Sequence, residues 1–132
     1  MPNFDYEAPT SLASALELLA RAGENRPLVG GTDIIDQLKS NRRHADLVVD
    51  LKRVPELLTL KSNGSGLRIG SAVSCTEIHK YTAEKGGFPA LSESTELVGS
   101  IHIQNRASVG GNVCNAAPSA DTIPALIIHE AV

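Results

Sequence analysis

Two pairs of adjacent glycines, each beside small polar residues, constrain this chain more than any other feature. One pair lies in Val29-Gly30-Gly31-Thr32-Asp33 and the other in Ser108-Val109-Gly110-Gly111-Asn112. Because glycine has no Cβ, each pair predicts a loop with positive φ that brings N–H groups close to a ligand. Such N–H groups bind anionic oxygens, most often those of phosphate. Two of these loops in one domain favour a ligand with two adjacent phosphates, held from both sides, over two turns that serve only as connections.

Composition narrows the function classes. The chain has 132 residues, of which 42% are hydrophobic and 20% charged, so we expect one modest folded domain, or one domain and part of another. The net charge of -3 argues against the basic surface that a nucleic-acid-binding domain needs. No apolar stretch approaches the length of a membrane span, and the N-terminus does not resemble a signal peptide, so a cytoplasmic location is expected.

The residue types that bind metals are few and scattered. Cys75 and Cys114 form no Cys-x-x-Cys pair, which argues against a zinc or iron–sulfur site within this chain, and both are expected to be buried free thiols. The four histidines share no ligand spacing, so we expect surface or structural roles for His44, His79, His102 and His129.

The first fifty-odd residues predict a β-α-β-α-β unit. Strands are expected at 4–6, 27–29 and 47–51, the last a continuous apolar run broken only by Asp50 and typical of a buried parallel strand. Asp33 is a candidate cap for the second helix, and Gly23 is expected just after the first. The first helix is expected to be capped by Thr10 or Ser11 and to bury Leu12, Ala15, Leu16, Leu19 and Ala22, and the second to bury Ile34, Ile35 and Leu38.

After Pro55 the predicted order of elements changes from alternating strands and helices to a hairpin followed by helices. Strands at 57–61 and 67–73 are predicted to form a hairpin around the turn at 63–66. A capping box at 74–77 opens a helix with Ile78 and Tyr81 on its inner face. Further helices are expected from about Pro89, with Leu91, Leu97 and Val98 inside, and from near Asp121, with Ala125, Leu126 and Ile128 inside. The sequence stops without a closing strand, so we expect an unfinished domain that is poorly stable alone.

Neither glycine pair matches the common nucleotide-binding loops. A Walker A loop needs a lysine after its last glycine, and both pairs lack one. The stretch 64–70 approaches the dinucleotide fingerprint Gly-x-Gly-x-x-Gly, but it is one residue too long and joins two strands instead of opening a helix.

Five motifs in order do resemble a known family. They are Phe4-x-Tyr6-x-x-Pro9-Thr10-Ser11-Leu12, Gly30-Gly31-Thr32-Asp33, Leu67-x-Ile69-Gly70-Ser71-Ala72-Val73, Ile103-x-Asn105-Arg106-x-Ser108-Val109-Gly110-Gly111-Asn112 and Ala117-Pro118-x-x-Asp121-x-x-Pro124-Ala125-Leu126. Together they resemble the FAD-binding medium subunit of molybdenum hydroxylases, the family of CO dehydrogenase and xanthine dehydrogenase. The resemblance implies an α+β, vanillyl-alcohol-oxidase-like (PCMH-type) FAD-binding domain. Its small α/β subdomain would span 1–54, and a larger α+β subdomain, here truncated, would span 55–132.

The resemblance also implies which residues contact FAD. The first loop would wrap the pyrophosphate through Leu28, Val29, Gly30, Gly31, Thr32, Asp33 and Ile34. The second would contact the diphosphate and ribityl groups through Ala107, Ser108, Gly110, Gly111 and Asn112. Asp121, with Ala120 beside it, matches a carboxylate that hydrogen-bonds the polyol. Val98 would pack near the adenine or be a plain core residue, and Asp33 would cap its helix or contact a flavin hydroxyl.

The function implied is electron transfer. A molybdenum cofactor in a large partner subunit and [2Fe-2S] clusters in a small one would pass electrons to FAD here and then to an external acceptor, in a hetero-oligomer whose substrate stays open. No catalytic acid, base or metal ligand is expected in this chain, since the redox chemistry belongs to the cofactor. Two alternatives remain: a stand-alone FAD-dependent oxidoreductase of the same fold, and a non-catalytic assembly domain.

Overall fold

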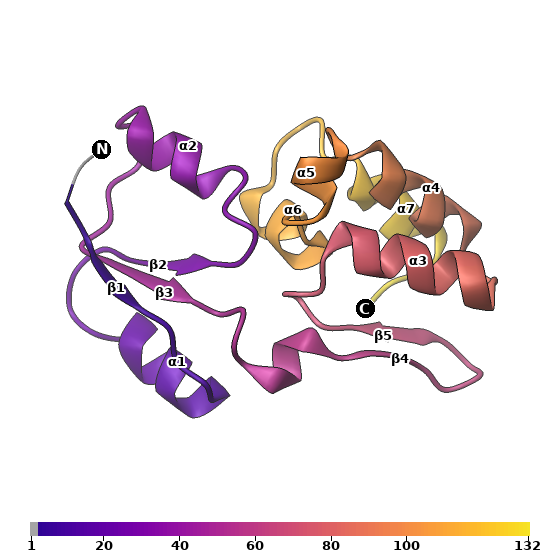
Figure 1. Cartoon of the computed structure of the whole chain (residues 1–132), viewed down its shortest axis with the longest axis horizontal. Coiled ribbons are helices and arrows are strands. Elements are labelled where there is room, and N and C mark those ends of the chain that lie inside the picture. The colour runs from indigo at the N-terminus through magenta and orange to yellow at the C-terminus, as the bar shows by residue number, and fades with distance from the viewer. Residues whose placement is uncertain (1–2) are drawn as a thin grey trace.

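The computed structural model, which describes residues 3–132, contains one parallel and one antiparallel sheet (Figure 1). Three parallel strands form the first sheet in the order β1-β3-β2: β1 (Asp5–Glu7), β2 (Asn25–Leu28) and β3 (Leu47–Asp50). Val48 of β3 pairs with Tyr6 on one side and Arg26 on the other. Every residue of the central strand β3 is buried, as expected for a parallel strand covered on both faces. The predicted β-α-β-α-β order is confirmed.

Two helices cover opposite faces of this sheet, α1 (Leu12–Leu19) and α2 (Ile34–Lys39) (Figure 1). The cluster on the α1 face consists of Leu18, Leu47 and Val49, with Leu19 and Leu51 partly buried against them. The cluster on the α2 face consists of Leu28, Leu38, Ala45 and Val48, with Phe4, Ile34 and Ile35 against them. The inner face predicted for α2 is therefore confirmed.

Helix α1 begins as predicted but ends early. The Ser11 hydroxyl accepts a hydrogen bond from the Ser14 N–H at 3.2 Å, which makes Ser11 the N-cap. The helix stops at Leu19 because the Asn25 side chain donates to the carbonyls of Leu19 and Arg21, at 3.5 and 2.6 Å, and replaces a further helical turn. The predictions that Ala22 is helical and that Gly23 directly follows the helix are wrong.

The buried face of α1 also differs from the prediction. Ala15 and Leu18 are buried, whereas Leu12 lies at the surface and Leu16 is 58% exposed. Leu19, predicted to be inside, is only partly buried. The apolar spacing was compatible with two adjacent faces, and the position of the sheet selected the one that contains Leu18.

Leu18→Ala is therefore expected to destabilise the chain by about 2–5 kcal/mol, the usual cost of truncating a buried leucine. Leu16→Ala on the same helix is the matched control and should change the free energy of unfolding by less than about 0.5 kcal/mol. Urea denaturation followed by circular dichroism measures both. Equal effects of the two substitutions would contradict the orientation of α1.

The second sheet is a short hairpin that follows a 3₁₀ helix (Pro55–Leu58). Strands β4 (Leu60–Ser62) and β5 (Leu67–Ile69) pair antiparallel, with Leu60 opposite Ile69. The hairpin is confirmed, but both strands are shorter than predicted. Pro55 supplies a helical φ and starts the 3₁₀ turn, which takes Leu57 and Leu58 out of the strand.

Five helices complete the fold (Figure 1): α3 (Cys75–Lys85), α4 (Pro89–Leu97), α5 (Ile101–Gln104), α6 (Val109–Asn115) and α7 (Thr122–Ile128). The capping box of Ser74 and Glu77 that opens α3 is confirmed. The core consists of Val73, Ile78, Leu91, Val109 and Ala125, against which Leu60, Leu67, Ile69, Phe88, Ala90 and Leu126 pack. No helix within residues 3–132 combines the length and the apolar character needed to cross a membrane.

At the ends of α4 and α7, residues that were predicted to lie in the core are exposed. Leu97, at the last position of α4, is 64% exposed, and the neighbouring Val98 turns inward and is buried. Ile128, at the last position of α7, is 68% exposed, whereas Ala125 is buried in the core and Leu126 packs against it. Both misplaced residues stand where a helix ends, so helical spacing no longer determines which way the next side chain points. The boundary predicted at residues 54 and 55 stays a prediction.

Candidate cofactor-binding site

The first glycine pair forms a loop between β2 and α2. Gly31 has a φ of +80°, which favours glycine, while Gly30 does not need positive φ. The carbonyl of Gly31 accepts from the Ile35 N–H at 3.2 Å and so starts the helix. Among residues 3–132, the N–H groups of Gly30, Gly31 and Thr32 donate to no other backbone or side-chain group. Three neighbouring donors without a protein acceptor match the predicted anion-binding loop.

Asp33 occupies the N-cap position of α2, but its side chain makes no capping hydrogen bond. Its φ and ψ of -100° and -50° already lie in the helical region, whereas a capping residue needs extended backbone angles. The prediction that Asp33 caps this helix is therefore wrong. Its carboxylate lies exposed at the loop, so the alternative, a contact with a flavin hydroxyl, stays a prediction.

The second glycine pair is not a loop but the first turn of helix α6. Gly110 and Gly111 are helical and neither has positive φ, so the prediction of a second left-handed loop is wrong. The Ser108 hydroxyl caps this helix by accepting from the Gly111 N–H at 3.0 Å. Gly110 is required for another reason, because a Cβ there would lie 2.5 Å from Cβ of Ser71 and 2.6 Å from its carbonyl oxygen.

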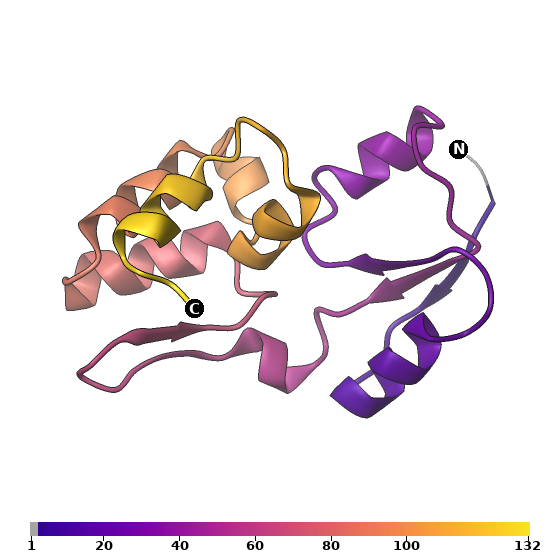
Figure 2. The same ribbon diagram turned by 180° about the vertical axis from the view of Figure 1, so that it is seen from behind.

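The two glycine segments lie against each other in space. A Cβ on Gly30 would lie 2.1 Å from the carbonyl oxygen of Arg106, so the two backbones meet where no side chain fits. A hydrogen bond of 3.0 Å from Gln37 Nε2 of α2 to Asn115 Oδ1 of α6 joins the same two regions. Both views show the loop after β2 beside α6 (Figures 1 and 2). The expectation that the two glycine segments face one site is confirmed as a juxtaposition, and their contacts with a ligand stay a prediction.

The other predicted residues differ in burial. Val98 is buried in a cluster with Cys75 and Ala107, so it has the packing of a core residue, and its contact with adenine stays a prediction. Asp121 stands exposed at the N-cap position of α7 without a capping hydrogen bond. Leu28 is buried at the end of β2, and Val29, Thr32, Ile34, Asn112 and Ala120 are half-buried.

No pattern in the sequence pointed to Gln37, Asn115 or Thr122 as residues of the site. Gln37 and Asn115 connect elements 78 residues apart through side-chain amides, a contact that only the tertiary structure produces. Thr122 is fully buried and binds the side chain of Asn112.

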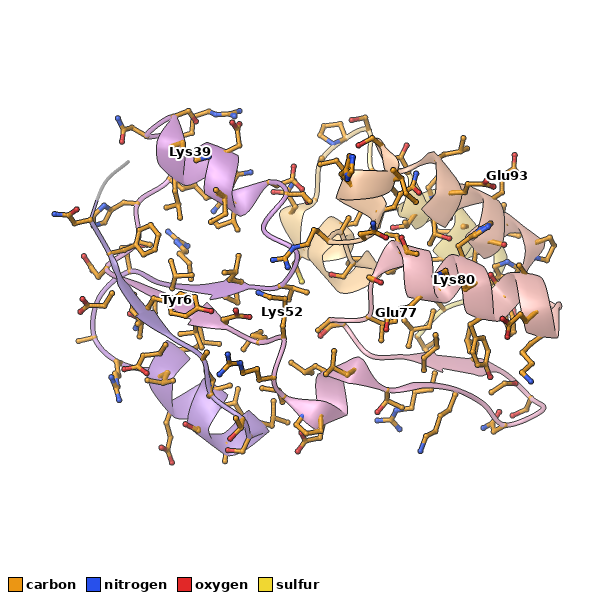
Figure 3. The ribbon with its side chains drawn as sticks, in the orientation of Figure 1. Tyr6, Lys39, Lys52, Glu77, Lys80 and Glu93 are labelled. Carbon is orange, nitrogen blue, oxygen red and sulfur yellow. The ribbon has the colours of Figure 1, made fainter. Side chains whose placement is uncertain are left out.

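A second polar cluster lies at the end of β3. Asp50 accepts from the Tyr6 hydroxyl at 2.5 Å and from Lys52 Nζ at 2.6 Å (Figure 3). Burial raises the pKa of Asp50, but the hydrogen bonds from Lys52 and Tyr6 outweigh it, and the net pKa lies below its usual value. The hydrogen bond to Asp50 in turn raises the pKa of Tyr6. The cluster fastens β1 to β3 and to the segment that follows.

Next to this cluster the protein surface has a hollow, and the residues that line it come from both sides of Pro55 in the sequence. The hollow is lined by Lys52, Leu58, Ala72, Ser74, Glu77, Asn105 and Arg106, of which Figure 3 labels Lys52 and Glu77. None of the predicted cofactor-binding residues lines it. We therefore place the candidate site at the glycine junction and not in this hollow.

The two cysteines differ in environment. Cys75 is buried, and burial raises the pKa of its thiol to about 11. Cys114 is exposed, so the prediction that both thiols are buried is wrong for it. Among residues 3–132, no three His, Cys, Asp or Glu side chains are grouped to hold a metal ion.

Comparison with known proteins identifies the family. The family described as FAD binding domain in molybdopterin dehydrogenase matches residues 2–132. The chain belongs to this family. Its α+β fold is thus that of a FAD-binding domain, and the resemblance recognised from the five motifs is confirmed.

Relatives of this FAD-binding domain support the assignment. The xanthine dehydrogenase FAD-binding subunit of Escherichia coli O157:H7 is 36% identical over 128 residues, which cover 96% of this chain and 44% of the relative. The carbon monoxide dehydrogenase medium chain of Hydrogenophaga pseudoflava is 29% identical over 128 residues, which again cover 96% of this chain and 44% of the relative. The chain thus spans less than half the length of these relatives.

Solved structures agree in fold. The cyanide-inactivated Cu,Mo-CO dehydrogenase matches with a TM-score of 0.85 and 29% identity over 92% of this chain and 43% of that one. Quinoline 2-oxidoreductase from Pseudomonas putida 86 matches with a TM-score of 0.85 and 26% identity over 90% of this chain and 42% of that one.

The residues at the junction fit the cofactor that the family implies. FAD carries an anionic pyrophosphate, and the loop of this FAD-binding domain offers three N–H donors that have no acceptor within residues 3–132. Hydrogen bonds from N–H groups to an anion are about twice as strong as those between neutral groups. The absence of a Cβ atom at Gly30 lets this loop pack directly on the backbone of Arg106, next to the second glycine segment.

Proposed function

We propose that this chain binds FAD at the junction of the Val29–Asp33 loop and the start of α6, within the electron-transfer subunit of a molybdenum hydroxylase. The observation that carries the proposal is the contact of Gly30 with the backbone of Arg106. It brings the two glycine segments of the family pattern to one place.

In this proposal, the cofactor is held by the two glycine segments and by Asp121. The N–H groups of Gly30, Gly31 and Thr32, with the Thr32 hydroxyl, donate to the pyrophosphate from one side. On the other side, the N–H group of Gly110 belongs to the first turn of α6 and has no acceptor within the helix. Asp121 accepts from hydroxyl groups of the polyol.

Bound FAD supplies the redox chemistry, since its ring accepts and releases electrons. The chain holds the cofactor through its pyrophosphate and polyol and needs no acid or base of its own. The metal centres belong to partner subunits in this proposal: a molybdenum cofactor in a large subunit and [2Fe-2S] clusters in a small one. The relatives named medium chains support it, since that name implies other chains in the complex. The external acceptor and a cytoplasmic location stay predictions.

Purification of the chain with its associated polypeptides from its native cells tests this function. We expect FAD, molybdenum and iron in the complex, measured by flavin fluorescence after denaturation and by elemental analysis. A complex without flavin would contradict the proposal. Flavin without molybdenum and iron would indicate a stand-alone oxidoreductase of the same fold instead.

A further inference from the structure

The side chain of Asn112 on α6 is tied to the first residue of α7. Its Oδ1 accepts from the Thr122 hydroxyl at 2.6 Å and from the Thr122 N–H at 3.4 Å. Thr122 has no exposed surface, so water cannot replace either contact. Two donors from one buried residue thus converge on one amide oxygen.

These contacts determine which end of the Asn112 amide faces outward. A backbone N–H can only donate, so the atom that faces the Thr122 N–H is the oxygen and not the nitrogen. The Nδ2 group is then directed away from Thr122. Among residues 3–132, no acceptor binds Nδ2, and it is not fully buried. Asn112 therefore presents two N–H donors beside the glycine pair.

The same arrangement explains why α7 has no conventional cap. The first N–H groups of a helix need acceptors from outside the helix. Asp121 holds the N-cap position without a side-chain capping bond, and Asn112 Oδ1 reaches across from α6 to accept from Thr122 instead. The Asp121 carboxylate is left without a capping role.

We propose that Thr122 is a positioning residue for FAD: its hydroxyl holds Oδ1 of Asn112 so that Nδ2 donates to the cofactor's pyrophosphate. This inference rests on the function proposed above. Without the hydroxyl, only the long contact of 3.4 Å with the Thr122 N–H holds Oδ1, so the amide turns more readily and presents Oδ1 to phosphate oxygens that carry negative charge. An acceptor facing an acceptor loses the hydrogen bond and adds repulsion.

Titration of FAD into Thr122→Val and Thr122→Ser variants of the chain, followed by flavin fluorescence, tests the inference. Valine keeps the shape of threonine without its hydroxyl, and we expect a Kd for FAD about 10- to 100-fold higher, the loss of one hydrogen bond to a charged group. Serine keeps the hydroxyl and should leave the Kd within about threefold of the parent chain. An unchanged Kd for Thr122→Val would overturn the inference.

Asn112→Asp separates positioning from simple packing. A carboxylate still accepts from both Thr122 donors, so the thermal transition should be retained, while FAD affinity falls because the donor is lost and a negative charge replaces it. Two carboxylate oxygens are equivalent, so adding Thr122→Val to Asn112→Asp should weaken FAD binding no further. An equal additional loss in the double variant would show that Thr122 acts by another route and would overturn the inference.

Asn112→Asp also serves where Thr122→Val folds too poorly to titrate. In that case, parent-like FAD affinity of Asn112→Asp would overturn the inference, and a loss of affinity at an unchanged thermal transition would support the Nδ2 donor on which the positioning role of Thr122 depends. The parent chain keeps the two proposals distinct. If it fails to bind FAD, the proposed function fails; if it binds and Thr122→Val binds equally well, only the positioning role fails.

Discussion

Gly30→Ala should weaken FAD binding by roughly two orders of magnitude or more. The added Cβ would lie 2.1 Å from the carbonyl oxygen of Arg106 and 3.0 Å from Cα of Ala107. Both are backbone atoms, so the clash is relieved only if the loop and the segment before α6 move apart. Losing two hydrogen bonds to a charged group costs about 3–6 kcal/mol, and each 1.4 kcal/mol is a factor of ten in affinity.

Gly66→Ala is the matched control for Gly30→Ala. Gly66 has ordinary φ, and an added Cβ there meets no atom within 4 Å. The Kd for FAD, measured by fluorescence titration, should be unchanged in this variant. If Gly30→Ala bound FAD as well as Gly66→Ala does, the junction would not be the FAD site.

Gly110→Ala and Gly111→Ala should have opposite effects on stability although they are neighbours. A Cβ on Gly110 would lie 2.5–2.7 Å from three atoms of Ser71, which forces α6 away from the turn before α3. Overpacking of this kind costs about 1–3 kcal/mol. At Gly111 the nearest atom is the Ser108 Oγ at 3.1 Å, and the backbone is helical, so alanine should stabilise by up to about 1 kcal/mol.

Urea denaturation of the FAD-free variants measures both effects. FAD titration of Gly111→Ala adds separate information, since a fall in affinity without a fall in stability would mean that the methyl group obstructs the ligand directly. Equal destabilisation by both substitutions would contradict the helical assignment of the second glycine pair.

Local patterns predicted the parts of this fold that local physics controls. Ser11 caps α1, and Ser74 with Glu77 forms the capping box of α3, because each pairs with N–H groups three residues away. The apolar run at 47–51 became the central strand β3, since a strand buried on both faces needs no polar residues. The position of the first glycine loop followed from the same alternation of strand and helix.

Long-range contacts decided what the sequence by itself did not determine. The pattern Ser108-Val109-Gly110-Gly111 is compatible with a loop and with a capped helix, and packing of Gly110 on Ser71 goes with the helix. The last turn of α1 was replaced by hydrogen bonds from Asn25, and its buried face was selected by the sheet.

The candidate site likewise combines residues that local patterns predicted with residues that only long-range contacts brought into place. Its glycines and Asn112 are visible in the sequence because backbone access to an anion requires small residues in a row. The groups that hold them in place, Arg106, Ser71, Gln37 and Thr122, carry no such pattern, since any residue whose atoms reach the right point serves. The sequence by itself therefore identified the candidate residues for FAD binding, while only the tertiary structure decided how they are positioned, because positioning depends on contacts between elements far apart in the chain.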